Sequence, residues 1–182
     1  SPSAQAGILF YQQLYGNHPY AHPPSGTADS LKKIKTDDLR AFHQQYFVAQ
    51  NATITMIGDI TDERAKAIAE KITSQLPQGQ AAPQQVAVPP LIKAVHKHIS
   101  FPSQQTHIMM GQASMRRDDK DYDAMYVGNE ILGGGGFGSI LMKELREKRG
   151  LTYGVYSSVV PMSAEGPFMI SLSTRSDQTQ QS

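Results

Sequence analysis

The chain lacks both cysteine and tryptophan among its 182 residues. Without cysteine it forms no disulfide, offers no thiolate to a metal ion and has no cysteine nucleophile. An excess of one charge is also missing, because 17 Lys and Arg oppose 16 Asp and Glu, a formal net charge of +1. A protein without a basic field has little attraction for a phosphate backbone, so nucleic acid is not an expected partner.

Long apolar runs are missing as well. No stretch of the sequence approaches the roughly 20 consecutive apolar residues of a membrane-spanning helix, and the first residues lack the charged and apolar regions of a signal peptide. A hydrophobic content of 39% is nevertheless ordinary for a chain that buries a core. The composition therefore predicts a globular protein without a membrane span.

The periodicity of the apolar residues predicts an α+β fold. Residues at three- and four-residue steps predict helices over 4–15, 36–48, 61–76, 122–132 and 139–149. Thr36 and Thr61 are the expected N-caps of the second and third of these, and Leu39 and Phe42 belong to a stripe expected to be buried. Strand-like runs cover 51–58, 95–101, 105–111, 152–160 and 167–174.

A change of composition divides this pattern into two lobes. Between Pro77 and Pro90 the sequence PQGQAAPQQVAVPP has no helical or strand period and no charged residue. Proline-rich segments of this kind are semi-extended spacers. We therefore expect residues 77–94 to be a linker between lobes at 1–76 and 95–182, each with an antiparallel-rich sheet packed against helices. We also expect the fold to be truncated at both ends.

The run Gly133, Gly134, Gly135 and Gly136 precedes the helix predicted from Ser139. With Gly138 it has the spacing of the dinucleotide fingerprint, but a helix comes before it and no acidic residue ends a second strand about 20 positions on. Each glycine costs about 1 kcal/mol relative to alanine in a helix. The run is therefore interpreted as a mobile hinge or a point of close backbone approach.

The histidines do not form a convincing ligand set. His18 and His22 have the four-residue spacing of a zinc helix, but Pro19 and the Pro23-Pro24 pair argue against a continuous helix and favour a structural loop. His96 and His98 share a strand face without a third ligand. We therefore expect no metal site in this chain.

Arg146 and Tyr153 are the candidate functional residues, on either side of a turn at Gly150, which is expected to end the preceding helix. An arginine offers a fork of donors to a carbonyl or carboxylate, and a tyrosine hydroxyl donates to an oxyanion while staying neutral to about pH 10. The alternative is that Arg146 is a solvated member of the ELREKR run and Tyr153 a packed strand residue.

The segments GGGGFGSILMKELREKRGLTYGVYS, LYGNHPYAHPPSGTADSLKKIKTDDLRAFHQQYF and NATITMIGDIT resemble the M16 metallopeptidases, the group of pitrilysin, insulin-degrading enzyme and mitochondrial processing peptidase. The resemblance implies repeated α+β domains, with 1–76 the second half of a zinc-side domain and 95–182 the first part of the next. It also implies that Tyr153 hydrogen-bonds the tetrahedral intermediate and that Arg146 holds the substrate chain.

The zinc-binding His-x-x-Glu-His motif of that family is absent from this chain, as is the third Glu ligand. We therefore expect the chain alone to bind no catalytic zinc and to hydrolyse nothing. The resemblance implies a portion of a zinc metalloendopeptidase that cleaves unfolded peptides, with zinc in the missing half of its own chain or in a sister subunit. The alternative is a non-catalytic assembly subunit that binds peptide or a sister protein. The resemblance and the Gln-rich linker favour a location in the bacterial periplasm or envelope.

The glycine run gives a first testable prediction. Added NAD or ATP is expected to leave the melting temperature of the protein unchanged, because the fingerprint lacks its strand and its acidic residue. A thermal shift titration measures this. A melting temperature that rose with nucleotide concentration would reassign the run as a nucleotide site.

Overall fold

The chain, described over all 182 residues by a computed structural model, forms two units. The larger comprises Ser1–Ser25 and Gln85–Ser182, and the smaller comprises Gly26–Gln84. The N-terminal helix α1 (Pro2–Tyr15) contacts strand β1 and so belongs to the larger unit, although it lies within the predicted lobe 1–76. The assignment of that lobe and of 95–182 to successive family domains stays a prediction.

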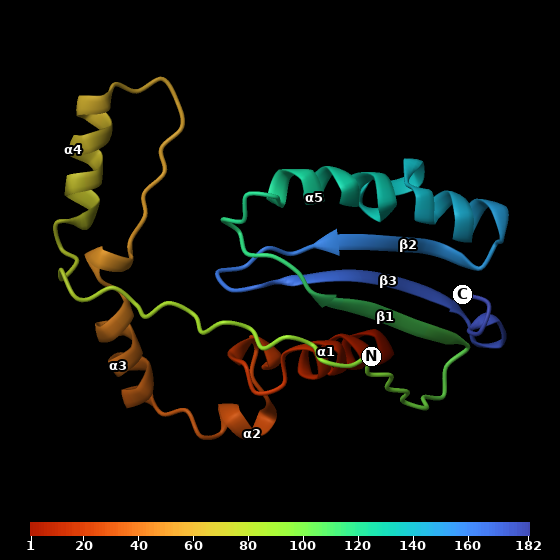
Figure 1. The fold of residues 1–182 in the computed structure, drawn as a ribbon. Coiled ribbons are helices and arrows are strands. Elements are labelled where there is room, and N and C mark those ends of the chain that lie inside the picture. Colours follow the sequence, from red (N-terminus) through yellow and green to blue (C-terminus); the bar gives the residue numbers. More distant parts are fainter. The chain divides into compact units, whose positions relative to one another are not determined.

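A three-stranded antiparallel sheet forms the centre of the larger unit (Figure 1). Its strands are β1 (Gln105–Ala113), β2 (Thr152–Val159) and β3 (Pro167–Arg175), in the order β1-β3-β2. The register pairs Ile108 and Val155 with Leu172 from either side. The strands predicted at 105–111, 152–160 and 167–174 are confirmed.

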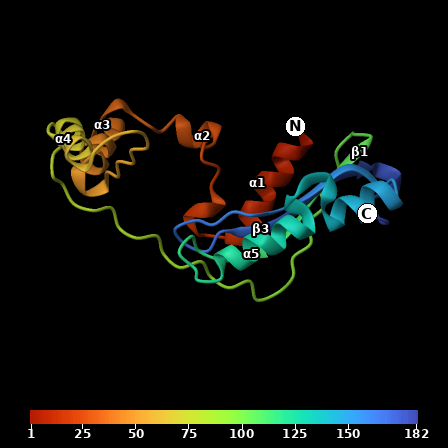
Figure 2. The same cartoon turned by 90° about the horizontal axis from the view of Figure 1, so that it is seen from above.

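Helices cover both faces of this sheet (Figure 2). On one face lie α5 (Tyr122–Asn129), a π-helix (Glu130–Gly134), a 3₁₀ turn (Gly136–Gly138) and a second π-helix (Met142–Lys148). Their core with the sheet contains Met142, Val155 and Leu172. On the other face, α1 and the 3₁₀ turn Pro19–Ala21 bury Leu14, Tyr15 and Ala21.

The smaller unit is helical, with α2 (Ala28–Leu31), α3 (Thr36–Tyr46), the 3₁₀ turn Ala49–Asn51 and α4 (Asp62–Thr73). Thr61 caps α4 as predicted, since its hydroxyl accepts from the Arg64 N–H at 3.4 Å. Lys35 rather than Thr36 occupies the N-cap of α3. The expected burial of Leu39 and Phe42 is wrong, because both are exposed and no surface of this unit covers their stripe.

Two predicted strands, over residues 51–58 and 95–101, do not form. Their alternating residues suit a strand, but a strand also needs a neighbouring backbone to accept and donate its hydrogen bonds, and neither segment has one. The prediction of a sheet in each lobe is therefore wrong for the smaller unit, which contains none.

The Pro- and Gln-rich segment has no regular structure, yet hydrogen bonds hold it at both ends. In the smaller unit, the Ala82 N–H donates to Asn51 Oδ1 at 2.7 Å. In the larger unit, the Val88 N–H donates to Glu165 Oε2 at 3.1 Å. The segment is thus more constrained than a free spacer. No helix of the structure has the length and apolar character needed to cross a membrane.

The sheet core predicts the effect of two methionine substitutions. Met142 is 0% exposed and Met110 is 54% exposed. Met142→Ala is expected to lower the free energy of unfolding by about 2 to 5 kcal/mol, because it leaves a cavity against Val155. Met110→Ala is the control and is expected to cost less than about 1 kcal/mol. Urea denaturation of both variants measures this, and equal losses would contradict the assigned core.

Candidate functional site

The glycine run packs closely against strand β2 at Gly133. A Cβ at Gly133 would lie 2.5 Å from Ser157 Oγ and 2.6 Å from the Ser157 N, distances that real Cβ atoms do not show. At Gly134 it would lie 2.5 Å from Asn129 Nδ2, and at Gly135 2.6 Å from the Glu130 carbonyl oxygen. Three glycines of the run are therefore explained by close packing, and the hinge role stays a prediction.

A tight turn follows the run and presents Phe137. Gly136 has φ of +63°, a conformation that glycine adopts at no steric cost. Its carbonyl oxygen accepts two hydrogen bonds from Ser139, one from the backbone N–H at 3.1 Å and one from the hydroxyl at 2.7 Å. Ser139 is buried, whereas Phe137 is 64% exposed. The turn thus fixes an aromatic ring at the surface.

Arg146 lies on the second π-helix, Met142–Lys148, whose Met142 side is buried against the sheet. π-Helices are rare and are frequent at functional sites. The Arg146 Cζ lies over the Phe137 ring, 4.5 Å from its centroid.

No ion pair or hydrogen bond engages the Arg146 guanidinium, and the nearby Glu144 pairs with Lys148 instead. The hydrogen bond from Lys148 lowers the pKa of the Glu144 carboxyl.

The turn at Gly150 connects Arg146 to the strand that carries Tyr153. Gly150 has φ of +62°, and its N–H donates to the Arg146 carbonyl at 3.1 Å, which confirms it as the predicted helix stop. Thr152 then enters β2, where its hydroxyl donates to the Ser173 carbonyl at 2.7 Å. The backbone of the helix end and of the strand start is therefore fixed.

Tyr153 lies in an irregularity of β2. Thr152 pairs with Thr174 and Val155 with Leu172, so the two residues between them on β2 face one residue on β3. Such a bulge redirects side chains and is frequent beside active sites. The Tyr153 side chain is 90% exposed. The alternative interpretation of Tyr153 as a packed strand residue is therefore wrong.

The structure places the two predicted site residues around one turn, as expected, but no hydrogen bond joins their side chains. Arg146 instead contacts Phe137, which the sequence analysis did not identify as a site residue. The sequence feature that could have indicated Phe137 is its position as an aromatic residue between the glycine run and the helix. Together these positions offer a guanidinium without an ion pair and a phenol without a hydrogen-bond partner, two groups able to bind peptide carbonyl groups.

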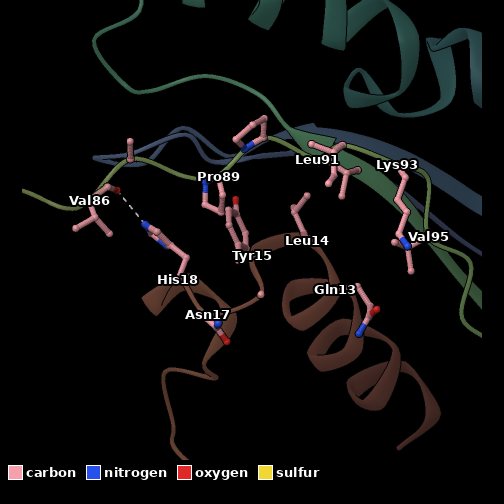
Figure 3. Close-up of a pocket in the computed structure, with 14 residues that line it drawn as sticks. Gln13, Leu14, Tyr15, Asn17, His18, Val86, Pro89, Leu91, Lys93 and Val95 are labelled. Carbon is pink, nitrogen blue, oxygen red and sulfur yellow. Dashed lines mark hydrogen bonds between the residues drawn. The ribbon is translucent and has the colours of Figure 1, made fainter.

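His18 has a structural role. Its Nδ1 accepts from the Tyr20 N–H at 3.2 Å, so its Nε2 carries the proton and donates to the Val86 carbonyl at 2.9 Å (Figure 3). The ring is buried, and the segment is a short 3₁₀ turn instead of a continuous helix, as the prolines predicted. The adjoining hollow of 490 Å³ is lined mainly by the end of α1 and by 86–95.

The aromatic cluster beside His18 ties α1 to the loop between β2 and β3. The buried Tyr15 hydroxyl donates to the Glu165 carbonyl at 3.2 Å. Burial, together with the neighbouring Tyr11, Tyr20 and Glu165, raises the pKa of Tyr15. Hydrogen bonds from its own N–H and from the Val88 N–H lower the pKa of the Glu165 carboxyl. These contacts explain the segment around His18 without any ligand.

The side chains of this chain do not fit a zinc centre. No three His, Cys, Asp or Glu side chains come together in a group that could hold a metal ion. His107, for example, contacts Ser173 Oγ at 2.8 Å through its Nδ1. Any metal-dependent step would therefore need ligands from outside these 182 residues.

Comparison with known proteins gives one consistent result. The family described as peptidase M16 inactive domain matches residues 33–182. An uncharacterized zinc protease of Mycobacterium leprae is 30% identical over 166 residues, 87% of this chain and 36% of that protein. A protein of Helicobacter pylori named non-peptidase homolog YmxG is 29% identical over 174 residues, 93% of this chain and 40% of that protein.

Solved structures agree with this result. The crystal structure of a peptidase M16 inactive domain from Pseudomonas fluorescens matches with a TM-score of 0.96 and 46% identity, covering 100% of this chain and 44% of that one. A protease from Helicobacter pylori matches in fold, with a TM-score of 0.84 at 24% identity over 96% of this chain and 43% of that one. The chain thus spans less than half the length of these relatives.

The close approach at Gly133 predicts a sharp difference between two glycines. Gly133→Ala is expected to lower the free energy of unfolding by about 1 to 3 kcal/mol, because the new methyl group overlaps the β2 backbone. Gly138→Ala is the matched control, since a Cβ there meets nothing within 4 Å. Denaturation curves of both variants measure the difference. A Gly133→Ala variant as stable as the control would show that the run is not tightly packed.

Proposed function

Because the chain belongs to the peptidase M16 family, we propose that it forms the substrate-clamping half of a zinc-dependent endopeptidase that cleaves unfolded peptides. The observation that carries this proposal is the exposed Tyr153 in the β2 bulge, directly after the turn that ends the Arg146 helix. Relatives named zinc proteases support the type of reaction.

Tyr153 acts on the reacting carbonyl in this proposal. When a peptide carbonyl becomes tetrahedral, its oxygen gains negative charge, and a donor aimed at that position stabilises the transition state more than the ground state. The Tyr153 hydroxyl has no hydrogen-bond partner within the chain and is free to donate. Its fixed strand neighbours reduce the reorganisation needed when substrate arrives.

Arg146 holds the substrate backbone. Its guanidinium carries five donors in one plane and no ion pair within the chain, so it is available to a carbonyl oxygen or a carboxylate. An unfolded peptide exposes its carbonyl groups, whereas a folded protein uses them internally. Arg146 therefore favours an extended, unfolded peptide as the substrate.

The zinc-bearing half is supplied from outside this chain, by the rest of its own polypeptide or by a sister subunit. This part of the proposal follows from the lack of a fitting ligand group among these residues. When bound there, zinc would polarise the carbonyl and activate water. Arg146 and Tyr153 contribute only positioning and charge stabilisation to that reaction.

A second candidate function is a non-catalytic assembly subunit that binds peptide without hydrolysis. The relative from Helicobacter pylori named a non-peptidase homolog favours this alternative. The two functions differ in turnover. Determining whether the full polypeptide or its partner carries a His-x-x-Glu-His motif separates them, because an assembly without that motif lacks the zinc ligands of the enzyme.

The catalytic role of Tyr153 is tested with the complete assembly and an unstructured fluorogenic peptide. Tyr153→Phe is expected to lower kcat about 10²-fold, the typical loss for one oxyanion donor. Tyr156→Phe is the matched control, because it removes the hydroxyl of another exposed tyrosine from the same strand and is expected to leave kcat within about twofold. Unchanged turnover in Tyr153→Phe would refute the role assigned to this residue.

A further inference from the structure

Phe137 supports Arg146 in a way that the family's two-residue pattern does not include. We propose that Phe137 is a positioning residue, whose ring face holds the Arg146 guanidinium ready to bind the backbone of the peptide substrate. The inference rests on the proposed function of Arg146. It adds a third residue to the pair Arg146 and Tyr153, and this residue precedes the helix that carries Arg146.

The contact itself has the geometry of a cation–π pair. The Arg146 Cζ lies 4.5 Å from the Phe137 ring centroid, within the roughly 6 Å over which such pairs are attractive. The ring attracts the positive charge of the guanidinium and is not a carboxylate or carbonyl acceptor that would take up its N–H donors. An aromatic partner therefore orients the group without occupying the donors that a substrate carbonyl needs.

A carboxylate partner would have the opposite effect, because a bidentate ion pair occupies two donors and neutralises the charge. Two glutamates flank Arg146 in the sequence, Glu144 and Glu147. Lys148 engages Glu144 one helical turn away, and Glu147 forms no ion pair with Arg146. The helix thus leaves Arg146 to the ring and keeps its charge available.

The backbone that carries the ring is positioned by a tight turn, and the ring itself is not buried. Gly136 has a positive φ that other residues rarely adopt, and Ser139 donates twice to the Gly136 carbonyl. Immediately before the turn, Gly133 packs against β2. Phe137 is therefore an exposed apolar side chain on a fixed platform. Arginine loses much rotamer freedom on binding, and a preformed contact reduces that loss.

The test compares three substitutions in the complete assembly. Phe137→Leu keeps an apolar side chain but removes the ring, and it is expected to raise KM for an unstructured peptide about two- to fivefold with kcat within about twofold. Phe137→Tyr keeps the ring and is expected to match the unsubstituted protein. Phe101→Leu, at an exposed position before β1, is the control and should change neither constant.

A double-substitution cycle separates positioning from a general effect on folding. In an Arg146→Met background, Phe137→Leu is expected to cause no further rise in KM, because the ring then has no guanidinium to hold. A second rise of the same size would show that Phe137 acts independently of Arg146 and would overturn the proposal.

A readout without turnover distinguishes this inference from the proposed function. In protein labelled with ¹⁵N-arginine, the ring current of Phe137 is expected to shift the Arg146 Nε–H signal, and Phe137→Leu but not Phe137→Tyr removes that shift. An unshifted signal overturns the contact even if Tyr153 proves essential. If the signal shifts and Tyr153→Phe lowers kcat but Phe137→Leu leaves KM unchanged, the positioning role fails while the proposed function stands.

Discussion

The contact between the backbone at Gly133 and the backbone of β2 at Ser157 constrains the rest of the larger unit. Because no side chain fits between them, the helical layer lies directly on the strand at this point. The Gly136 turn and the helix Met142–Lys148 follow this contact along the chain. The helix that carries Arg146 and the strand that carries Tyr153 pack together in one core, which contains Met142 and Val155.

Two different local irregularities carry the two site residues. Tyr153 leaves the regular sheet through a bulge, and Arg146 lies on a π-helix instead of an α-helix. Both departures weaken regular hydrogen bonding and are tolerated because the neighbouring backbone is anchored, at Thr152 by Ser173 and at Arg146 by Gly150. Local irregularity on a fixed frame is a common arrangement at functional sites.

Sequence reasoning succeeded where a property is local and failed where it depends on a distant surface. The helix cap at Thr61 and the stop at Gly150 depend on a few neighbouring residues, and both were predicted. The runs at 51–58 and 95–101 have the composition of strands, but pairing depends on a backbone elsewhere. Phe137 was missed because its contact with Arg146 depends on the turn at Gly136, which periodicity does not describe.

The β2 bulge also affects how this protein behaves toward other copies of itself. In the order β1-β3-β2, strand β2 is an edge strand of this three-stranded sheet. A regular, flat edge is a template for aggregation, and bulges are one of the features by which natural proteins prevent such pairing. The distortion that presents Tyr153 to a peptide thus also makes β2 a poor template for uncontrolled strand addition.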